Sequence, residues 1–145
     1  MSKLYGSVVN RIFEGRILNE DKLIHTGDDI NMYYWSDVHC YYVTAVENQK
    51  RIRVKEYNVC ADKSKQNGMG HQNWLYFKTL KEMNEYLNKY HPGKYPTDVK
   101  DNDEETWVFR YGGWWRETAK GKYAKLDGKI TVGKNIKNYY YDWSF

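Results

Sequence analysis

The chain has 145 residues and a formal net charge of +4, with 23 lysine and arginine residues against 19 aspartate and glutamate residues. This length predicts one domain spanning residues 1–145, large enough to bury its own core without disulfides or metals. No apolar run approaches the ~20 residues that a membrane-spanning helix needs, and the first residues lack the pattern of a secretory signal. We therefore expect neither a membrane protein nor a secreted disulfide scaffold.

Two cysteines, Cys40 and Cys60, form no CxxC pair. Their number and spacing predict reduced thiols in a cytosolic protein.

Aromatic residues are the unusual part of the composition. Fifteen tyrosines, six tryptophans and four phenylalanines make up 17% of the chain. Aromatic side chains favour strands because they pack well on a pleated, half-buried surface. The composition therefore indicates a strand-rich body.

The predicted elements follow one another as short strands with a single helix. Between Lys50 and Glu56, Ile52 and Val54 alternate with cationic residues, which predicts a strand with one buried face and one cationic face. Thr79 followed by Glu82 matches a capping box, and an apolar face repeats at helical spacing after it. The predicted strands are residues 8–13, 30–35, 41–46, 50–56, 74–78, 106–111, 114–117, 129–132 and 139–143.

These strands carry turn signals every eight to twelve residues. Gly112-Gly113, for example, predicts a hairpin turn between two of them. The fold class expected is mainly β, or β-rich α+β. Its geometry would be a small bent antiparallel sheet or a Src-homology-3-like barrel, with one inserted helix near residues 80–90.

Several short motifs occur together in a fixed order. They include Trp35-Ser36-Asp37-Val38-His39, Asn67-Gly68-Met69 and the ending Tyr139-Tyr140-Tyr141-Asp142-Trp143-Ser144-Phe145. Together they resemble a group of small uncharacterised proteins of bacteriophages and prophages, which carry WSDxH, NGM and YYDYSF-like motifs. The similarity covers most of residues 28–78 and 104–145, and the chain departs from the group at 70–72 and 79–103. The resemblance implies a phage accessory protein that acts in the bacterial host cytoplasm.

Catalytic and metal-binding patterns are weak. Ser36, Asp37 and His39 are triad residue types, but they lie within four positions of one another, whereas a working triad normally draws on separate elements. A turn capped by Asp37 is the preferred interpretation. The histidines and cysteines never approach ligand spacing; only tertiary clustering of Cys40, Cys60 and His71 would make a zinc site. We expect no metal, no cofactor and no catalytic residue.

Anion binding is better supported by the sequence. Arginine forms bidentate hydrogen bonds to phosphate, and tryptophan offers a stacking surface for a base. The alternative is that the cations keep an aromatic-rich chain soluble while the rings serve the core. The predicted ligand-binding residues are Arg51, Arg53, Arg110, Arg116, Trp114, Trp115 and Trp74.

Two functional hypotheses share these residues. The first is a non-catalytic counter-defence protein that sequesters a nucleotide-derived immune signal, with a cyclic nucleotide or an ADP-ribose derivative as the ligand. The second is an accessory protein that binds single-stranded nucleic acid, or inhibits a host nucleic-acid or defence enzyme by direct contact. A small phosphodiesterase or nuclease is the third alternative, for which no catalytic motif is present.

The segment from Tyr139 to Phe145 has more rings than one small strand can bury. We expect part of it to pack against a second copy of the chain, so self-association through this segment is predicted.

Overall fold

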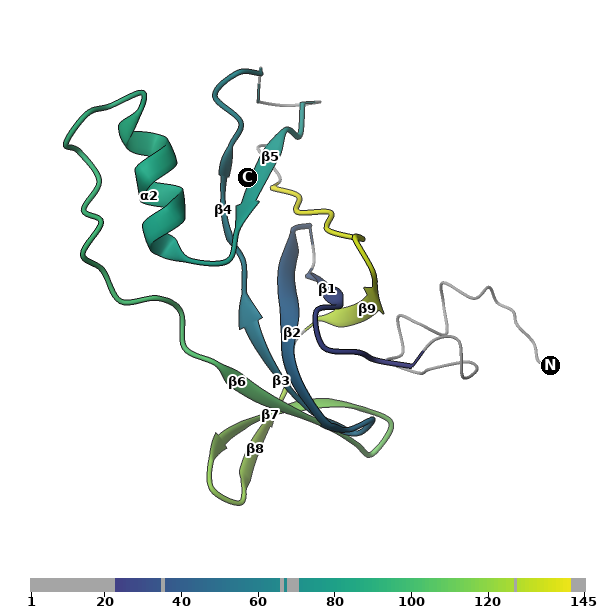
Figure 1. Ribbon diagram of the computed structural model, residues 1–145. Helices are drawn as coiled ribbons and strands as arrows, with labels where there is room; N and C mark the ends of the chain where they lie inside the picture. Colours follow the sequence, from purple (N-terminus) through teal and green to yellow (C-terminus); the bar gives the residue numbers. More distant parts are fainter. Residues whose placement is uncertain (1–22, 35, 66, 68–70, 127, 142–145) are drawn as a thin grey trace.

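The computed structural model describes residues 23–34, 36–65, 67, 71–126 and 128–141. These residues form a mainly β structure (Figure 1). A seven-stranded antiparallel sheet has the order β8-β7-β6-β3-β2-β1-β9. Its strands are β1 (Asp29–Tyr33), β2 (Val38–Asn48), β3 (Arg51–Glu56), β6 (Glu105–Arg110), β7 (Gly113–Ala119), β8 (Lys122–Lys125) and β9 (Lys129–Gly133).

A second, two-stranded sheet consists of β4 (Asn58–Ala61) and β5 (Trp74–Phe77). The helix α2 (Leu80–Asn88) follows directly and packs against both strands. The expectation of a β-rich fold with one helix near residues 80–90 is therefore confirmed for the described part of the chain.

The helix begins and ends where its sequence signals place it. The Thr79 side chain accepts a hydrogen bond from the backbone N–H of Glu82 at 3.2 Å, as in the predicted capping box. A second acceptor comes from the loop after the helix, because Asp101 Oδ1 lies 3.1 Å from the backbone nitrogen of Leu80. Leu87 and Asn84 form the buried face of the helix.

The inner face of the large sheet carries the main core. Ile52 and Val54 of β3 are fully buried, while Arg51 and Arg53 lie on the opposite, outer face, so the predicted alternation is confirmed. Trp107 of β6 is also fully buried. Cores of this kind lose about 2–5 kcal/mol when a large apolar residue is cut back to alanine.

The large sheet bends strongly. Met32 and Tyr41, from β1 and β2, line the same cavity as Arg116 and Leu126, which lie in β7 and directly after β8. Strands near the two ends of the sheet order thus approach each other across the inner face. The bent antiparallel sheet, one of the two expected geometries, describes this arrangement.

In the described part of the chain, the outer face of the sheet is covered at one end only. There Cys40, Tyr42 and Tyr57 form a second buried cluster, with Tyr76 and Tyr139 packed against it. Figure 1 shows β4, β5 and α2 at the upper end of the molecule and β6, β7 and β8 at the lower end. The outer face of β6–β8 therefore lies away from the small sheet and the helix.

The C-terminal segment is tied to β1 by polar contacts. Asp29 is buried, and its carboxylate lies 3.1 Å from Lys137 Nζ. Asn31 Oδ1 accepts from the backbone N–H of Asn138 at 3.0 Å. Of the strand predicted at 139–143, only residues 139–141 are described, and there Tyr140 forms an isolated bridge with Val38.

The predicted interface segment, Tyr139 to Phe145, is only partly described. Tyr139 is half-buried, whereas Tyr140 and Tyr141 are each 42% exposed. Residues 142–145 lie outside the described residues, and self-association stays a prediction.

Three differences from the expected elements have local causes. The turn between β6 and β7 is Tyr111-Gly112, one residue earlier than predicted, because Arg110 pairs with Gly113. The strands β4 and β8 were not predicted, since each has only four residues and no clear alternation. The strand predicted at 8–13 lies outside the described residues.

Cys40 and Cys60 are free thiols, as predicted. Burial raises the pKa of Cys40 to about 11, and its Sγ donates to Asn31 Oδ1 at 3.1 Å. Only the thiolate is a good nucleophile, so Cys40 should be unreactive in the folded chain.

Under iodoacetamide at pH 8 we expect the half-buried Cys60 to be alkylated first and Cys40 only after unfolding, as read by peptide mass spectrometry. Faster alkylation of Cys40 than of Cys60 in the native protein would contradict this placement.

The inner face should dominate stability. Ile52→Ala should lower the free energy of unfolding by about 2–5 kcal/mol, because it opens a cavity in the core. The matched change on the neighbouring outer position, Arg53→Ala, should cost less than about 1 kcal/mol, since its ion pairs are exposed. Urea denaturation of both variants measures the difference. Equal losses at the two positions would mean that the two faces are assigned wrongly.

Candidate functional site

Cationic and aromatic side chains gather on the outer face of β6, β7 and β8. The register of the three strands places them together. Trp115 of β7 lies between Val108 of β6 and Lys125 of β8. Two positions further along β7, Glu117 lies opposite Tyr123 of β8. Directly opposed residues share one face of a sheet. We call this the hairpin surface, and it consists of Arg110, Tyr111, Trp115, Tyr123 and Lys125.

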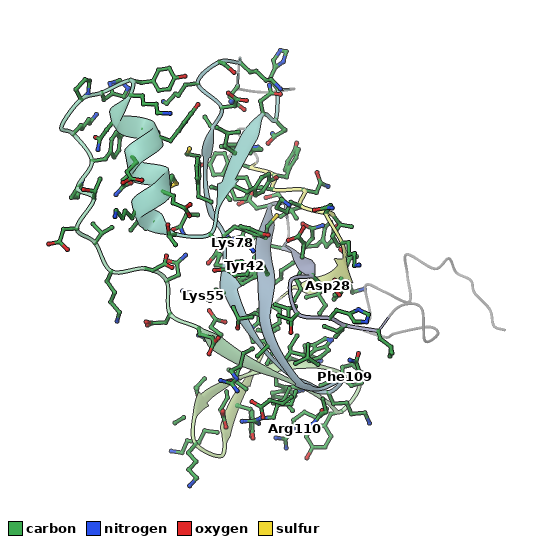
Figure 2. The ribbon with its side chains drawn as sticks, in the orientation of Figure 1. Asp28, Tyr42, Lys55, Lys78, Phe109 and Arg110 are labelled. Atoms are coloured by element: carbon green, nitrogen blue, oxygen red, sulfur yellow. The ribbon has the colours of Figure 1, made fainter. Side chains whose placement is uncertain are left out.

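The guanidinium of Arg110 is held between two tyrosine rings. Its Cζ lies 4.7 Å from the ring centroid of Tyr111 and 4.6 Å from that of Tyr123. Arg110 Nη2 also donates to the Tyr111 hydroxyl at 3.1 Å. Figure 2 shows Arg110 at the lower end of the molecule, away from the helix. Because rings satisfy the flat faces of a guanidinium, its edge N–H groups remain available for an anion.

Trp115 contacts the backbone of Arg110 and the ring of Tyr111. Its indole Nε1 donates to the backbone carbonyl of Arg110 at 3.0 Å. Its ring lies 6.2 Å from the ring of Tyr111 at an interplanar angle of 79°, an edge-to-face contact. The tryptophan is half-buried, so it supports Tyr111 from the side.

Tyr111 is placed in a backbone conformation that bulky residues rarely adopt. Its φ is 52°, and that of Gly112 is 75°; positive φ at both positions of a two-residue hairpin loop is the signature of a type I′ turn. Such turns favour Asn-Gly, whereas a left-handed backbone costs an ordinary L-residue about 1–2 kcal/mol. Yet the Tyr111 side chain is 80% exposed, so burial does not offset that cost.

Lys125 adds a second cation beside the first. A β-carbon added at Gly113 would lie 3.3 Å from Lys125 Cε and 3.6 Å from its Nζ, so the lysine side chain runs over that glycine. Gly113 is the direct partner of Arg110 in the register. Among the described residues, neither Arg110 nor Lys125 forms an ion pair.

Arg51 and Arg53 lie on the same outer face but are neutralised there. Arg51 contacts Glu47 and Glu117, each at 3.2 Å. Arg53 contacts Glu47 at 3.2 Å and Glu104 at 3.7 Å. Their positive charges are therefore balanced by neighbouring carboxylates.

The other three predicted ligand-binding residues lie elsewhere. Trp114 is 5% exposed and belongs to the core, where it packs against Phe109. Trp74 belongs to β5 of the small sheet and contacts Tyr139 edge to face. Arg116 lies opposite the buried Trp107, which puts it on the inner face, where it lines a cavity of about 240 Å³. The structure thus brings together Arg51, Arg53, Arg110 and Trp115 only.

Sequence reasoning missed Tyr111, Tyr123 and Lys125. Tyr123 and Lys125 belong to β8, the strand that was not predicted. The Gly112-Gly113 pair predicts the turn, and that prediction puts Tyr111 in the preceding strand. The sequence signal for the observed turn is Tyr111 directly before Gly112, between two predicted strands.

Of the three triad residue types, His39 pairs with a glutamate of β3. His39 Nδ1 lies 3.2 Å from Glu56 Oε2, and this hydrogen bond raises the pKa of His39. The histidine ring also packs edge to face on Tyr34.

Within the described ranges, no three potential metal ligands cluster, and no helix is long and apolar enough to cross a membrane.

Comparisons with protein-family models, curated proteins and solved structures found no match to this chain. The resemblance to phage proteins stays a prediction. Function is therefore inferred from the residues and their geometry.

Tyr111→Asn tests whether this tyrosine serves the fold. Asparagine tolerates the left-handed conformation, so the strain is relieved, while an exposed cation–π contact worth about 0.5–1 kcal/mol is lost. The two effects nearly cancel, and the free energy of unfolding should stay within about 1 kcal/mol of the parent value. Thermal and urea melts measure it. A larger loss would show that the ring at this position stabilises the fold.

Proposed function

We propose that this protein is a non-catalytic binder of single-stranded nucleic acid and that the hairpin surface is its binding site. Arg110 and Lys125 pair with backbone phosphates, and the ring of Tyr111 stacks on a base. This combination of cations and exposed rings is what sequence-tolerant recognition of single strands requires. The proposal adopts the second of the two hypotheses raised by the sequence.

One observation carries the proposal: the strained, exposed tyrosine lies beside an arginine that has no carboxylate partner among the described residues. A strained residue persists when the surrounding structure holds it in place, and such residues cluster at functional sites. The turn would be less strained with asparagine at position 111. Selection for a stacking ring explains why a tyrosine stands there.

A single strand fits this surface better than a duplex does. The bases of a duplex are stacked on each other, so their faces are closed to a protruding ring, whereas those of a single strand are open. The net charge of +4 is also modest beside the dense phosphate charge of duplex DNA.

Sequestration of a small nucleotide is the alternative. It needs Arg51 or Arg53 to meet a phosphate together with Arg110 or Arg116. Arg116 lies on the face opposite to Arg51 and Arg53, and those two arginines are paired with glutamates. The open hairpin surface supports a chain of nucleotides better than an enclosed small ligand. A role in phage counter-defence stays a prediction from the resemblance.

Fluorescence anisotropy with labelled oligothymidylate and oligouridylate of about twelve nucleotides tests the proposal, since comparable surfaces bind about 4–16 nucleotides. The parent protein should bind both. Tyr111→Asn should weaken binding by about 1–3 kcal/mol, the value of one base–aromatic stack. Arg110→Gln should weaken binding and lower the slope of log affinity against log salt by about 0.7, the value for one phosphate of a single strand.

Two matched variants control for general effects. Tyr90→Asn removes an exposed tyrosine just after α2, and Arg53→Gln removes an arginine that is already paired with glutamates. Both should bind the oligonucleotides as the parent does. The proposal fails if the parent binds neither oligonucleotide, or if Tyr111→Asn binds as tightly as Tyr90→Asn. Tighter binding of a mononucleotide or cyclic nucleotide than of the oligonucleotides would favour the sequestration hypothesis instead.

A further inference from the structure

The bend of the large sheet forms a partly open cavity on the inner face, and Lys125 of the hairpin surface also lies at its edge. Its volume is about 240 Å³, and its walls include residues from β1, β2, β6 and β7. At ~30 Å³ per molecule this is room for about eight waters, which is the size of a single amino acid. The cavity is therefore too small for a nucleotide chain.

The cavity is lined by one acidic and two basic residues, namely Glu105 of β6, Arg116 of β7 and Lys125 of β8. Since Arg116 lies opposite Trp107, Glu105 is its diagonal neighbour, at a Cα separation of about 7–8 Å. Within the described residues, Arg116 forms no ion pair with Glu105 or with any other acid.

Trp107 holds the carboxylate of Glu105 in place. Glu105 Oε1 accepts a hydrogen bond from the indole Nε1 of the fully buried Trp107 at 2.9 Å. One N–H donor leaves most of the lone pairs of a carboxylate unused. An ammonium group in the cavity would therefore find a fixed acceptor.

Apart from Lys125, the remaining walls are apolar or phenolic. Met32 is 2% exposed, and Leu126 packs against the same core. Tyr41 is buried, and burial raises the pKa of its hydroxyl, which keeps its proton and can donate a hydrogen bond. An aliphatic group fits against Met32 and Leu126 without leaving a polar atom unpaired.

We propose that this cavity binds a zwitterion of amino-acid size with an apolar side chain. Its carboxylate pairs with the fork of Arg116, and its ammonium group pairs with Glu105. Its side chain packs on Met32 and Leu126. A ligand carrying both charges at the α-carbon bridges these two groups, which do not pair with each other in the structure.

The probe is L-leucine, with glycine lacking the side chain, 4-methylpentanoate lacking the ammonium group and leucinol lacking the carboxylate. Titration calorimetry to about 10 mM, with thermal shift in parallel, should show binding of L-leucine in the millimolar range or tighter. Each of the three analogues should bind at least about tenfold more weakly, because each lacks one of the paired groups.

Arg116→Gln and Glu105→Gln should each weaken leucine binding by about tenfold or more. Glutamine at 105 still offers an oxygen to Trp107, so the core is preserved. Arg53→Gln, on the outer face, is the matched control and should leave leucine binding unchanged. The proposal is overturned if L-leucine does not bind, if 4-methylpentanoate or leucinol binds as tightly, or if Arg53→Gln weakens binding as much as Arg116→Gln. These readouts do not depend on nucleic-acid binding, so either proposal can fail without the other.

Discussion

Strand β1 is buried on both of its faces, and this constraint organises the rest of the molecule. Ile30 and Met32 enter the main core, so the alternating residues Asp29 and Asn31 must be buried on the other side. A buried carboxylate is costly unless it is paired and hydrogen-bonded. Asp29 receives hydrogen bonds from Lys137 and from the hydroxyl of Tyr57, which requires the C-terminal segment and the residue just before β4 to lie over this face.

That requirement divides the outer face into two parts. Over β1 and β2 it is covered by the small sheet and the C-terminal segment, and the rings of Tyr42, Tyr57 and Tyr76 fill the junction. Over β6–β8 no described element covers the same face, because β4, β5 and α2 lie at the other end of the molecule (Figure 1). The aromatic excess of the sequence thus serves two different purposes at the two ends of one sheet.

The sequence predicted the elements whose signals are local. The alternation around Ile52 and Val54 and the capping box at Thr79 are determined within a few residues, and both predictions were confirmed. The neutralisation of Arg53 by Glu104 joins residues about fifty positions apart, and no local pattern contains it. A surface ion pair is therefore visible only once the strands are placed.

The position of one turn shows why the candidate site was harder to predict than the fold. Side chains alternate along a strand, so moving a hairpin turn by one residue changes which residues stand opposite each other across the hairpin. With the turn at Tyr111-Gly112, Trp115 shares the outer face with Arg110, while Trp114 enters the core and Arg116 lines the cavity. Composition alone treats these four residues as one cationic and aromatic cluster. Alternation along β7 places Trp115 on the outer face and Trp114 and Arg116 on the inner face, and the turn at Tyr111-Gly112 decides which residues of β6 they stand opposite.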